Sequence, residues 1–179
     1  MKKDLLLIFS FVIILVILIG GVKIESVQEH YLNNIDNITN ETEVITLEID
    51  CHLIYDNWDI LTPSLKEENY LPENGYVLKS TELVLREADT VYDILLRASK
   101  HFRIQLETKG YGDSKYIRGI SYLYEFDCGA LSGWVYLVNG IKGDQSISDY
   151  KLKNNDYINI VYTCDLGDDV LEENYENIR

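Results

Sequence analysis

The chain has 179 residues and a formal net charge of −14, which is enough for one domain and a targeting segment. The negative charge argues against nucleic acid as a partner, because phosphate binding needs clusters of Lys and Arg, and it disfavours a position on an anionic lipid surface. Tyrosine is common, with 14 residues, which is typical of half-buried strands and of aromatic ligand platforms.

An apolar run from Leu5 to Val22 follows two lysines and contains one polar residue, Ser10. A helix over this run reaches roughly 27 Å, close to the hydrocarbon thickness of a bilayer. A cleaved signal peptide has a shorter apolar region and a small-residue cleavage site, and the exit Gly20-Gly21-Val22-Lys23 lacks such a site. We therefore expect residues 1–24 to be a signal anchor, with a cleaved signal as the alternative.

The lysines before the run place the N-terminus in the cytoplasm, by the positive-inside rule. The expected product is a single-pass protein of the cell membrane whose C-terminal domain is extracytoplasmic; cleavage would make it a secreted protein. We expect the polar residues 25–43 to form a tether and residues 44–167 to form the domain. We expect residues 168–179 to be an acidic, disordered tail.

Val44 to Ile54 alternates apolar and polar residues, which predicts a strand with one buried face. Asp56 to Gly75 holds both prolines and many charges, so we expect a loop or a short helical turn. Thr81 to Arg86 predicts a second, short strand.

Asp89-Thr90 opens the one main helix that the sequence predicts. Thr90 is a good N-cap, and Asp93 stands three residues later, as in a capping box. One helical stripe carries the apolar side chains, which indicates a helix packed on a sheet; these are Val91, Ile94, Leu95, Ala98 and Phe102.

The remainder of the chain is strand-rich. Arg103–Thr108, Ile117–Phe126, Trp134–Val138 and Tyr157–Cys164 are expected strands, and Asn139-Gly140 is a strong turn signal. One helix on one mixed sheet is an α+β architecture of β-grasp-like kind.

Several segments together resemble the transcobalamin C-terminal-like domain of bacterial surface proteins. They are Val91-Tyr-Asp-Ile-Leu95, Tyr124-Glu-Phe-Asp-Cys-Gly129, Leu131-Ser-Gly-Trp-Val-Tyr136, Val138-Asn-Gly140 and Tyr162-Thr-Cys-Asp-Leu-Gly167. The resemblance covers roughly residues 45–167. It implies a β-grasp-like α+β fold and a binding role without catalysis. In the eukaryotic relatives this domain is the smaller half of a cobalamin carrier and covers one face of the corrinoid.

The chain departs from its close bacterial relatives in one loop, from Ile141 to Ser148. Relatives carry an aromatic residue after Asn-Gly and a cysteine shortly after it, at the positions of Ile141 and Ile147 here. Their Asp-Gly-Asp turn is Asn154-Asn155-Asp156 in this chain. Ligand contacts made by this loop in relatives do not carry over directly.

Three cysteines in an extracytoplasmic domain indicate one disulfide and one leftover thiol. In a β-grasp-like sheet the first and last strands are parallel neighbours, so Cys51 and Cys164 would end side by side. We predict a Cys51–Cys164 disulfide with Cys128 left over, its usual partner in relatives being the cysteine replaced at Ile147. Cys51–Cys128 and three reduced thiols are the alternatives.

Trp134 and Tyr136 point to the same face of their strand, and Gly133 before them permits a close backbone approach. We predict an aromatic platform for a planar ligand, completed by Asn139 and by Tyr111 and Tyr116 from a glycine-containing turn. The alternative is that Trp134 packs the helix on the sheet and that Asn139-Gly140 only turns the hairpin.

No metal site, cofactor or catalytic constellation stands out, since none of the three histidines pairs with another at metal-ligand spacing. The leading hypothesis is a membrane-tethered, non-enzymatic binding module for a small ligand, with a corrinoid as the candidate, which hands the ligand to a transporter or surface protein. A structural or adhesive module that binds protein or glycan is the alternative.

Overall fold

The computed structural model of the protein describes residues 38–39, 41–67 and 71–170. The predicted signal anchor and most of the predicted tether lie outside these residues. Among the residues described, no helix has the length and hydrophobicity needed to cross a bilayer.

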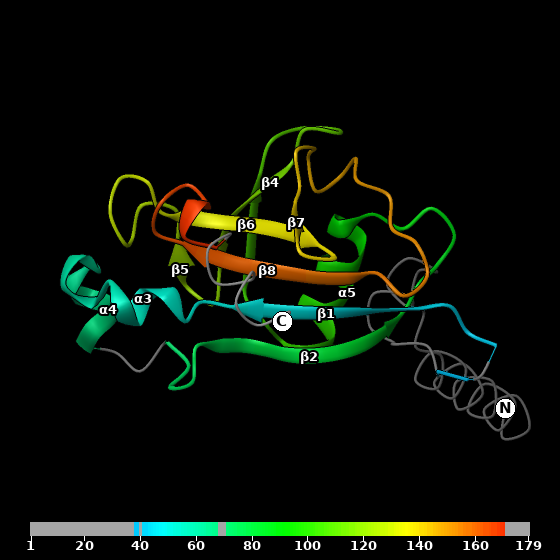
Figure 1. The fold of residues 1–179 in the computed structure, drawn as a ribbon, viewed down its shortest axis with the longest axis horizontal. Helices are drawn as coiled ribbons and strands as arrows, with labels where there is room; N and C mark the ends of the chain where they lie inside the picture. The colour runs from blue at the N-terminus through cyan, green and yellow to red at the C-terminus, as the bar shows by residue number, and fades with distance from the viewer. Residues whose placement is uncertain (1–37, 40, 68–70, 171–179) are drawn as a thin grey trace, which may run out of the picture. The chain divides into compact units, whose positions relative to one another are not determined.

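A mixed five-stranded sheet forms the centre of the domain (Figure 1). Its two middle strands, β1 (Val44–Asp50) and β8 (Tyr157–Thr163), are parallel neighbours, as the sequence predicted for the first and last strands. The other strands extend the sheet on both sides in the order β2-β1-β8-β6-β7, with β2 at Tyr76–Val84, β6 at Gly133–Val138 and β7 at Ile141–Lys142.

Alternating apolar residues place one face of β1 and β8 in the core. Ile45, Leu47 and Ile49 of β1 are fully buried, and so are Ile158, Ile160 and Tyr162 of β8. Burial of each such side chain stabilises the fold by about 1.5–3 kcal/mol. The register sets Ile49 beside Ile160, so the two middle strands pack the same layer.

The main helix, α5 (Val91–Phe102), lies on this buried face. Thr90 and Asp93 form the predicted capping box: the Asp93 amide donates to Thr90 Oγ1 at 3.3 Å, and the Thr90 amide donates to Asp93 Oδ2 at 3.0 Å. The apolar stripe from Val91 to Ala98 is buried against the sheet. The prediction for this helix is confirmed.

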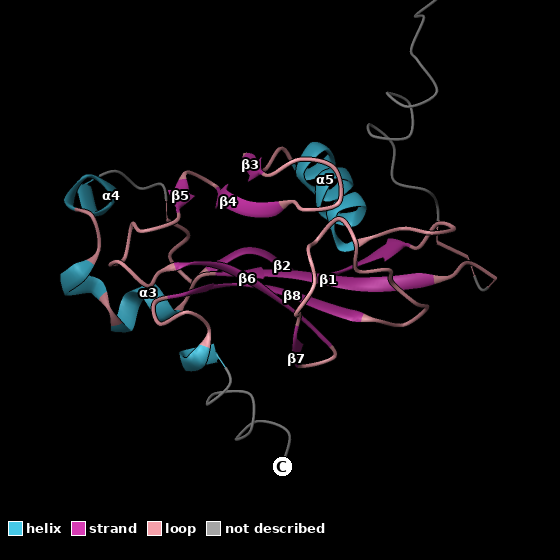
Figure 2. Ribbon diagram, turned by 90° about the horizontal axis from the view of Figure 1, so that it is seen from above, coloured by secondary structure: helices cyan, strands magenta, loops and turns pink. Residues whose placement is uncertain are grey.

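A second sheet of three short strands lies beside α5 on the same face of the central sheet (Figure 2). It contains β3 (Leu106–Lys109), β4 (Tyr116–Ile120) and β5 (Leu123–Tyr124). The α+β class is confirmed, but the expectation of one sheet is wrong. Ser121 and Tyr122 adopt positive φ angles of 51° and 66° and fold what was predicted as one strand, Ile117–Phe126, into a hairpin.

The predicted first strand also ends early, at Asp50 rather than Ile54. The Asp50 carboxylate accepts from the His52 amide at 2.8 Å and contacts His52 Nδ1 at 2.6 Å, which turns the chain out of the sheet. The next segment holds three helical turns, at α3 (Leu53–Asp56), η1 (Trp58–Ile60) and α4 (Pro63–Glu67).

The acidic tail starts later than expected. Residues 168–170 form a helical turn, and the Asp169 carboxylate accepts from the Cys164 amide at 2.8 Å and from the Thr163 hydroxyl. Val170 is buried with Leu53, Leu137 and Val161 in a second apolar cluster. The expectation of disorder is therefore wrong for these three residues, because a cap and an apolar contact order them.

A buried ion pair ties the end of β2 to α5. Arg97 donates to both carboxylate oxygens of Asp89, at 2.9 and 2.7 Å, and to the Val84 carbonyl at 2.7 Å. Both side chains are only 9 % exposed. Asp89 also accepts from the Arg86 amide at 2.8 Å, so the pair fixes the loop that leads into the helix.

Arg97→Ala should lower the free energy of unfolding by about 3–5 kcal/mol, because the Asp89 carboxylate is left buried without its cation. Urea unfolding followed by circular dichroism measures the change. Lys100→Ala, an exposed position on the same helix, is the control and should change stability by about 0.5 kcal/mol or less. An equal, small effect of both substitutions would contradict this account of the pair.

Candidate ligand pocket

A pocket of about 180 Å³ opens between β4, β6 and the loop that follows β7. Three aromatic side chains and two lysines contribute to its lining, together with the loop backbone: Tyr116, Trp134, Tyr136, Lys115 and Lys142. The lining comes from segments far apart in the sequence, which the hairpin of β6 and β7 and the neighbouring second sheet bring together.

Trp134 forms a fixed wall of the pocket. Its indole Nε1 donates to the Leu123 carbonyl at 2.9 Å, and its ring meets Tyr162 edge to face at 5.2 Å. Only 8 % of the residue is exposed. Trp134 therefore packs the core, as the alternative for this residue held, and also presents one part of its surface to the pocket.

Tyr136 is anchored at both ends. It follows Trp134 by two residues on the same face of β6, and its hydroxyl donates to the Gln145 carbonyl at 2.8 Å. The ring meets Tyr150 edge to face at 5.7 Å. Burial is the main cause that raises the pKa of Tyr136 to about 12, and the nearby Asp144 and Asp149 raise it further. Tyr136 is therefore a neutral hydrogen-bond donor at neutral pH.

Gly143 lets the loop after β7 lie directly on the Tyr136 ring. A Cβ atom at this position would stand 1.9 Å from Tyr136 Cζ, and the Gly143 amide donates to the Tyr136 carbonyl at 2.9 Å. The sequence pointed instead to Gly133, where a Cβ would meet Glu125 at an ordinary 3.9 Å. Glu125 therefore makes only an ordinary contact at Gly133, and Gly143 is the glycine at which another segment lies against the pocket wall.

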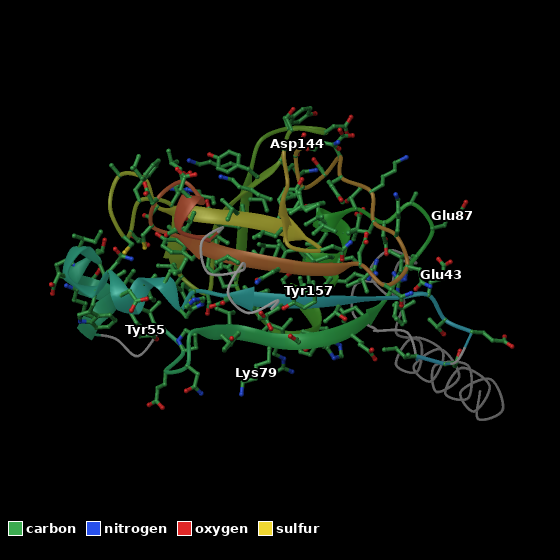
Figure 3. All side chains as sticks on the ribbon, viewed as in Figure 1. Glu43, Tyr55, Lys79, Glu87, Asp144 and Tyr157 are labelled. Atoms are coloured by element: carbon green, nitrogen blue, oxygen red, sulfur yellow. The ribbon has the colours of Figure 1, made fainter. Side chains whose placement is uncertain are left out.

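Two serines join the loop to the start of β4. The Ser146 hydroxyl donates to the Lys115 carbonyl at 2.7 Å, and the Lys115 amide donates to Ser148 Oγ at 3.2 Å. Ile147, between them, is 3 % exposed and packs into the core. The loop after β7 is thus an ordered wall of the pocket. Asp144 lies on this loop, at the top of the view (Figure 3).

The two lysines bring positive charge to an acidic chain. Lys115 Nζ lies 4.5 Å from the centroid of the Tyr92 ring and 3.4 Å from the Gly112 carbonyl. Lys142 Nζ donates to the Leu166 carbonyl. Within the described ranges neither ammonium forms an ion pair with a carboxylate, so both remain suited to attract an anionic group.

Two of the five predicted ligand-binding residues lie outside the pocket lining. Asn139 occupies the turn with φ 54°, donates to Asp156 Oδ1 at 2.8 Å and accepts from the Tyr157 amide at 2.9 Å. Its side chain joins two turns, as the alternative held. Tyr111 is 95 % exposed on the turn after β3. The structure brings together Tyr116, Trp134 and Tyr136 only.

The expected Cys51–Cys164 disulfide is absent from the structure, where all three cysteines are thiols. Cys51 Sγ donates to the Gly75 carbonyl at 3.2 Å. Cys164 Sγ lies 3.1 Å from Cys128 Sγ. The parallel register explains the difference. Asp50 pairs with Val161, so the position level with Cys51 is Tyr162, and Cys164 lies two residues further along the chain.

No cluster of three metal-ligating side chains occurs in the part of the chain that the structure describes. His52 contacts Asp50, and His101 packs edge to face on Phe102 at 4.7 Å. His30 lies outside the described residues.

One known protein family matches a segment of the chain that contains the main helix, the pocket and the last strand. Residues 88–163 match the family model described as "Domain of unknown function (DUF4430)". The resemblance identified in the sequence is confirmed, since this segment contains four of the stretches that carried it. No curated protein matches the chain in sequence.

Among the solved structures that match the chain are the following two. Haptocorrin in complex with Cbi shares 15 % identity over 70 % of this chain, with a TM-score of 0.44, and the chain spans 26 % of haptocorrin. A candidate metal binding protein from Ruminococcus gnavus ATCC 29149 shares 12 % identity over 68 % of this chain and 96 % of its own, with a TM-score of 0.38.

Gly143→Ala should lower the free energy of unfolding by about 1–3 kcal/mol, because the anchored Tyr136 ring cannot move away from the new methyl group. Gly133→Ala is the matched control, because its methyl group would make only an ordinary contact with Glu125 at 3.9 Å, and it should stay within about 0.5 kcal/mol of the parent chain. Thermal unfolding of both variants checks the difference. Equal stability of the two would show that the loop does not rest on the ring.

Proposed function

We propose that the domain is a non-enzymatic binding module that holds a small ligand, or one substituent of a larger ligand, beside Tyr116, Trp134 and Tyr136. The observation that carries the proposal is the pocket itself, in which hydrogen bonds fix the side chains of Trp134 and Tyr136 before any ligand arrives. Fixed walls favour binding because little side-chain entropy is lost when the ligand is ordered.

The size and charge of the pocket define the ligand class. A cavity of about 150 Å³ holds benzene, so about 180 Å³ fits one ring or a short chain. The lysines favour an anionic end group on that ring or chain. A corrinoid, the candidate from the family resemblance, would enter with one peripheral substituent while its macrocycle stays outside.

Tyr116 offers the cleanest test, because it lines the pocket and is 45 % exposed. Tyr116→Ala should weaken binding of cobalamin or cobinamide about 5–10-fold in isothermal titration, since one aromatic wall is lost. Tyr111→Ala, at an exposed tyrosine outside the pocket, is the matched control and should leave Kd unchanged. If no heat of binding is measured up to millimolar corrinoid, corrinoids are excluded as the ligand. If both variants lose affinity equally, the pocket is excluded as the binding site.

A surface module that binds protein or glycan is the second candidate, favoured by a group of exposed apolar side chains. Tyr55 and Trp58 stack at 5.8 Å with an interplanar angle of 9°, and each is 37 % exposed. Tyr55 lies at one end of the domain, away from Asp144 (Figure 3). Retention on cell-wall material that Trp58→Ala abolishes and Tyr116→Ala preserves would favour this role over ligand capture.

We also propose that residues 1–24 anchor the module in the cell membrane with the domain outside, ready to pass ligand to a transporter or surface protein. The apolar run and its preceding lysines support this topology. The full chain should remain in the membrane fraction after alkaline carbonate extraction, and a chain that starts at residue 25 should be released. Recovery of a shortened, soluble product from the full chain would show cleavage instead.

A further inference from the structure

Two sulfur atoms from distant segments meet at one end of the central sheet. Cys128 lies in the loop between β5 and β6 and is fully buried, while Cys164 directly follows β8 and is half-buried. Their Sγ atoms are 3.1 Å apart. The two cysteines are 36 residues apart in the sequence, so both segments need a fixed position for their sulfur atoms to lie this close.

Local hydrogen bonds hold the backbone of each cysteine. The Cys128 amide donates to Ser132 Oγ at 3.0 Å, and Ser132 Oγ lies 2.8 Å from the Gly129 carbonyl, which closes the loop on itself. The Cys164 amide donates to Asp169 Oδ2 at 2.8 Å. Neither cysteine therefore depends on the other for its position.

Contacts other than the sulfurs join the two segments. The Leu166 amide donates to the Leu131 carbonyl at 2.9 Å. The Tyr162 hydroxyl is shared between the Tyr124 carbonyl at 2.7 Å and Ser132 Oγ at 3.0 Å. The loop after β5 and the turn after β8 are thus docked by backbone and tyrosine hydrogen bonds, with the two thiols facing each other between them.

We propose that Cys128 and Cys164 form the disulfide of this domain and that Cys51 remains a thiol. A disulfide needs the sulfurs at about 2.05 Å, so an approach of about 1 Å, within reach of small side-chain rotations, completes the bond. Cys51 is committed elsewhere, because its thiol donates to the Gly75 carbonyl at the opposite side of β1 from β8.

The oxidant is a small-molecule disulfide such as oxidised glutathione. The Cys164 thiolate attacks one sulfur of the oxidant, whose S–S bond breaks and releases one thiol. The Cys128 thiolate then attacks the Cys164 sulfur of the mixed disulfide and releases the second thiol. Two cysteine thiols are oxidised and one disulfide is reduced to two thiols, so the exchange balances.

The surroundings make this exchange slow at neutral pH. Burial is the main cause that raises the pKa of both the Cys164 and the Cys128 thiols, and Asp169 raises both further. Since the thiolate is the reactive form, the bond should form faster as the pH rises. Burial likewise raises the pKa of Cys51 to about 12, which keeps that thiol unreactive.

The assignment is tested by refolding the full chain from denaturant in a mixture of oxidised and reduced glutathione. In the unfolded chain the oxidant reaches all three thiols, so burial does not prevent the reaction. Proteolysis without reductant followed by mass spectrometry should recover a Cys128–Cys164 cross-linked peptide, with one free thiol per chain. Cys51→Ser should keep the cross-link, and Cys164→Ser should abolish it. A cross-link that contains Cys51, or three free thiols after a refolding in which native circular dichroism returns, would overturn the proposal.

Stability gives a second readout. The closed loop restricts the unfolded chain, so the oxidised protein should melt roughly 10 °C above the reduced protein. Cys51→Ser should show the same difference, and the Cys128→Ser/Cys164→Ser double variant should show none with or without reductant. A difference that persists in the double variant would assign the effect to another bond.

Discussion

The parallel pairing of β1 with β8 is the contact on which the rest of the domain depends. It joins an early segment of the described chain to a late one. β2 pairs with β1 and β6 pairs with β8, and β7 joins the sheet through β6. β8 holds β6, and β6 carries Trp134 and Tyr136 into the pocket. The helix packs on the layer that Ile49 and Ile160 share. A change in this register would move the pocket walls and the apolar core together.

Much of this architecture could be predicted because its signals are local. Strict alternation identifies β1 and β8, and Thr90 with Asp93 identifies the start of α5. The second sheet could not be foreseen, since Ser121 and Tyr122 adopt positive φ without a glycine to signal the turn. The early end of β1 accompanies a contact between Asp50 and His52 that no pattern in the sequence indicates.

The pocket shows the same division between local and long-range information. Trp134 and Tyr136 share a face because strands alternate, and this much followed from the sequence. Tyr116 joins them only because β4 packs near β6, and Gly143 matters only because the loop folds back on Tyr136. Asn139 and Tyr111 were selected by residue type, yet Asn139 turns the chain and Tyr111 is exposed to solvent.

The pairing of the cysteines also depends on the register of the parallel strands. Cys164 lies two residues beyond the position level with Cys51, and its sulfur lies beside that of Cys128.

The order of the middle strands has a consequence for how the chain is made. Leu47 pairs with Ile158, and at a synthesis rate of about 5–20 residues per second β1 waits roughly 5–20 s for its partner. β2 follows closely and covers one edge of β1, but the edge meant for β8 stays open, with an apolar face beside it. An open edge of this kind is a template for a strand from another chain. The nascent β1–β2 pair therefore leaves the inner edge of β1 open, and a second copy that supplied its own β8 there would produce a strand-exchanged dimer.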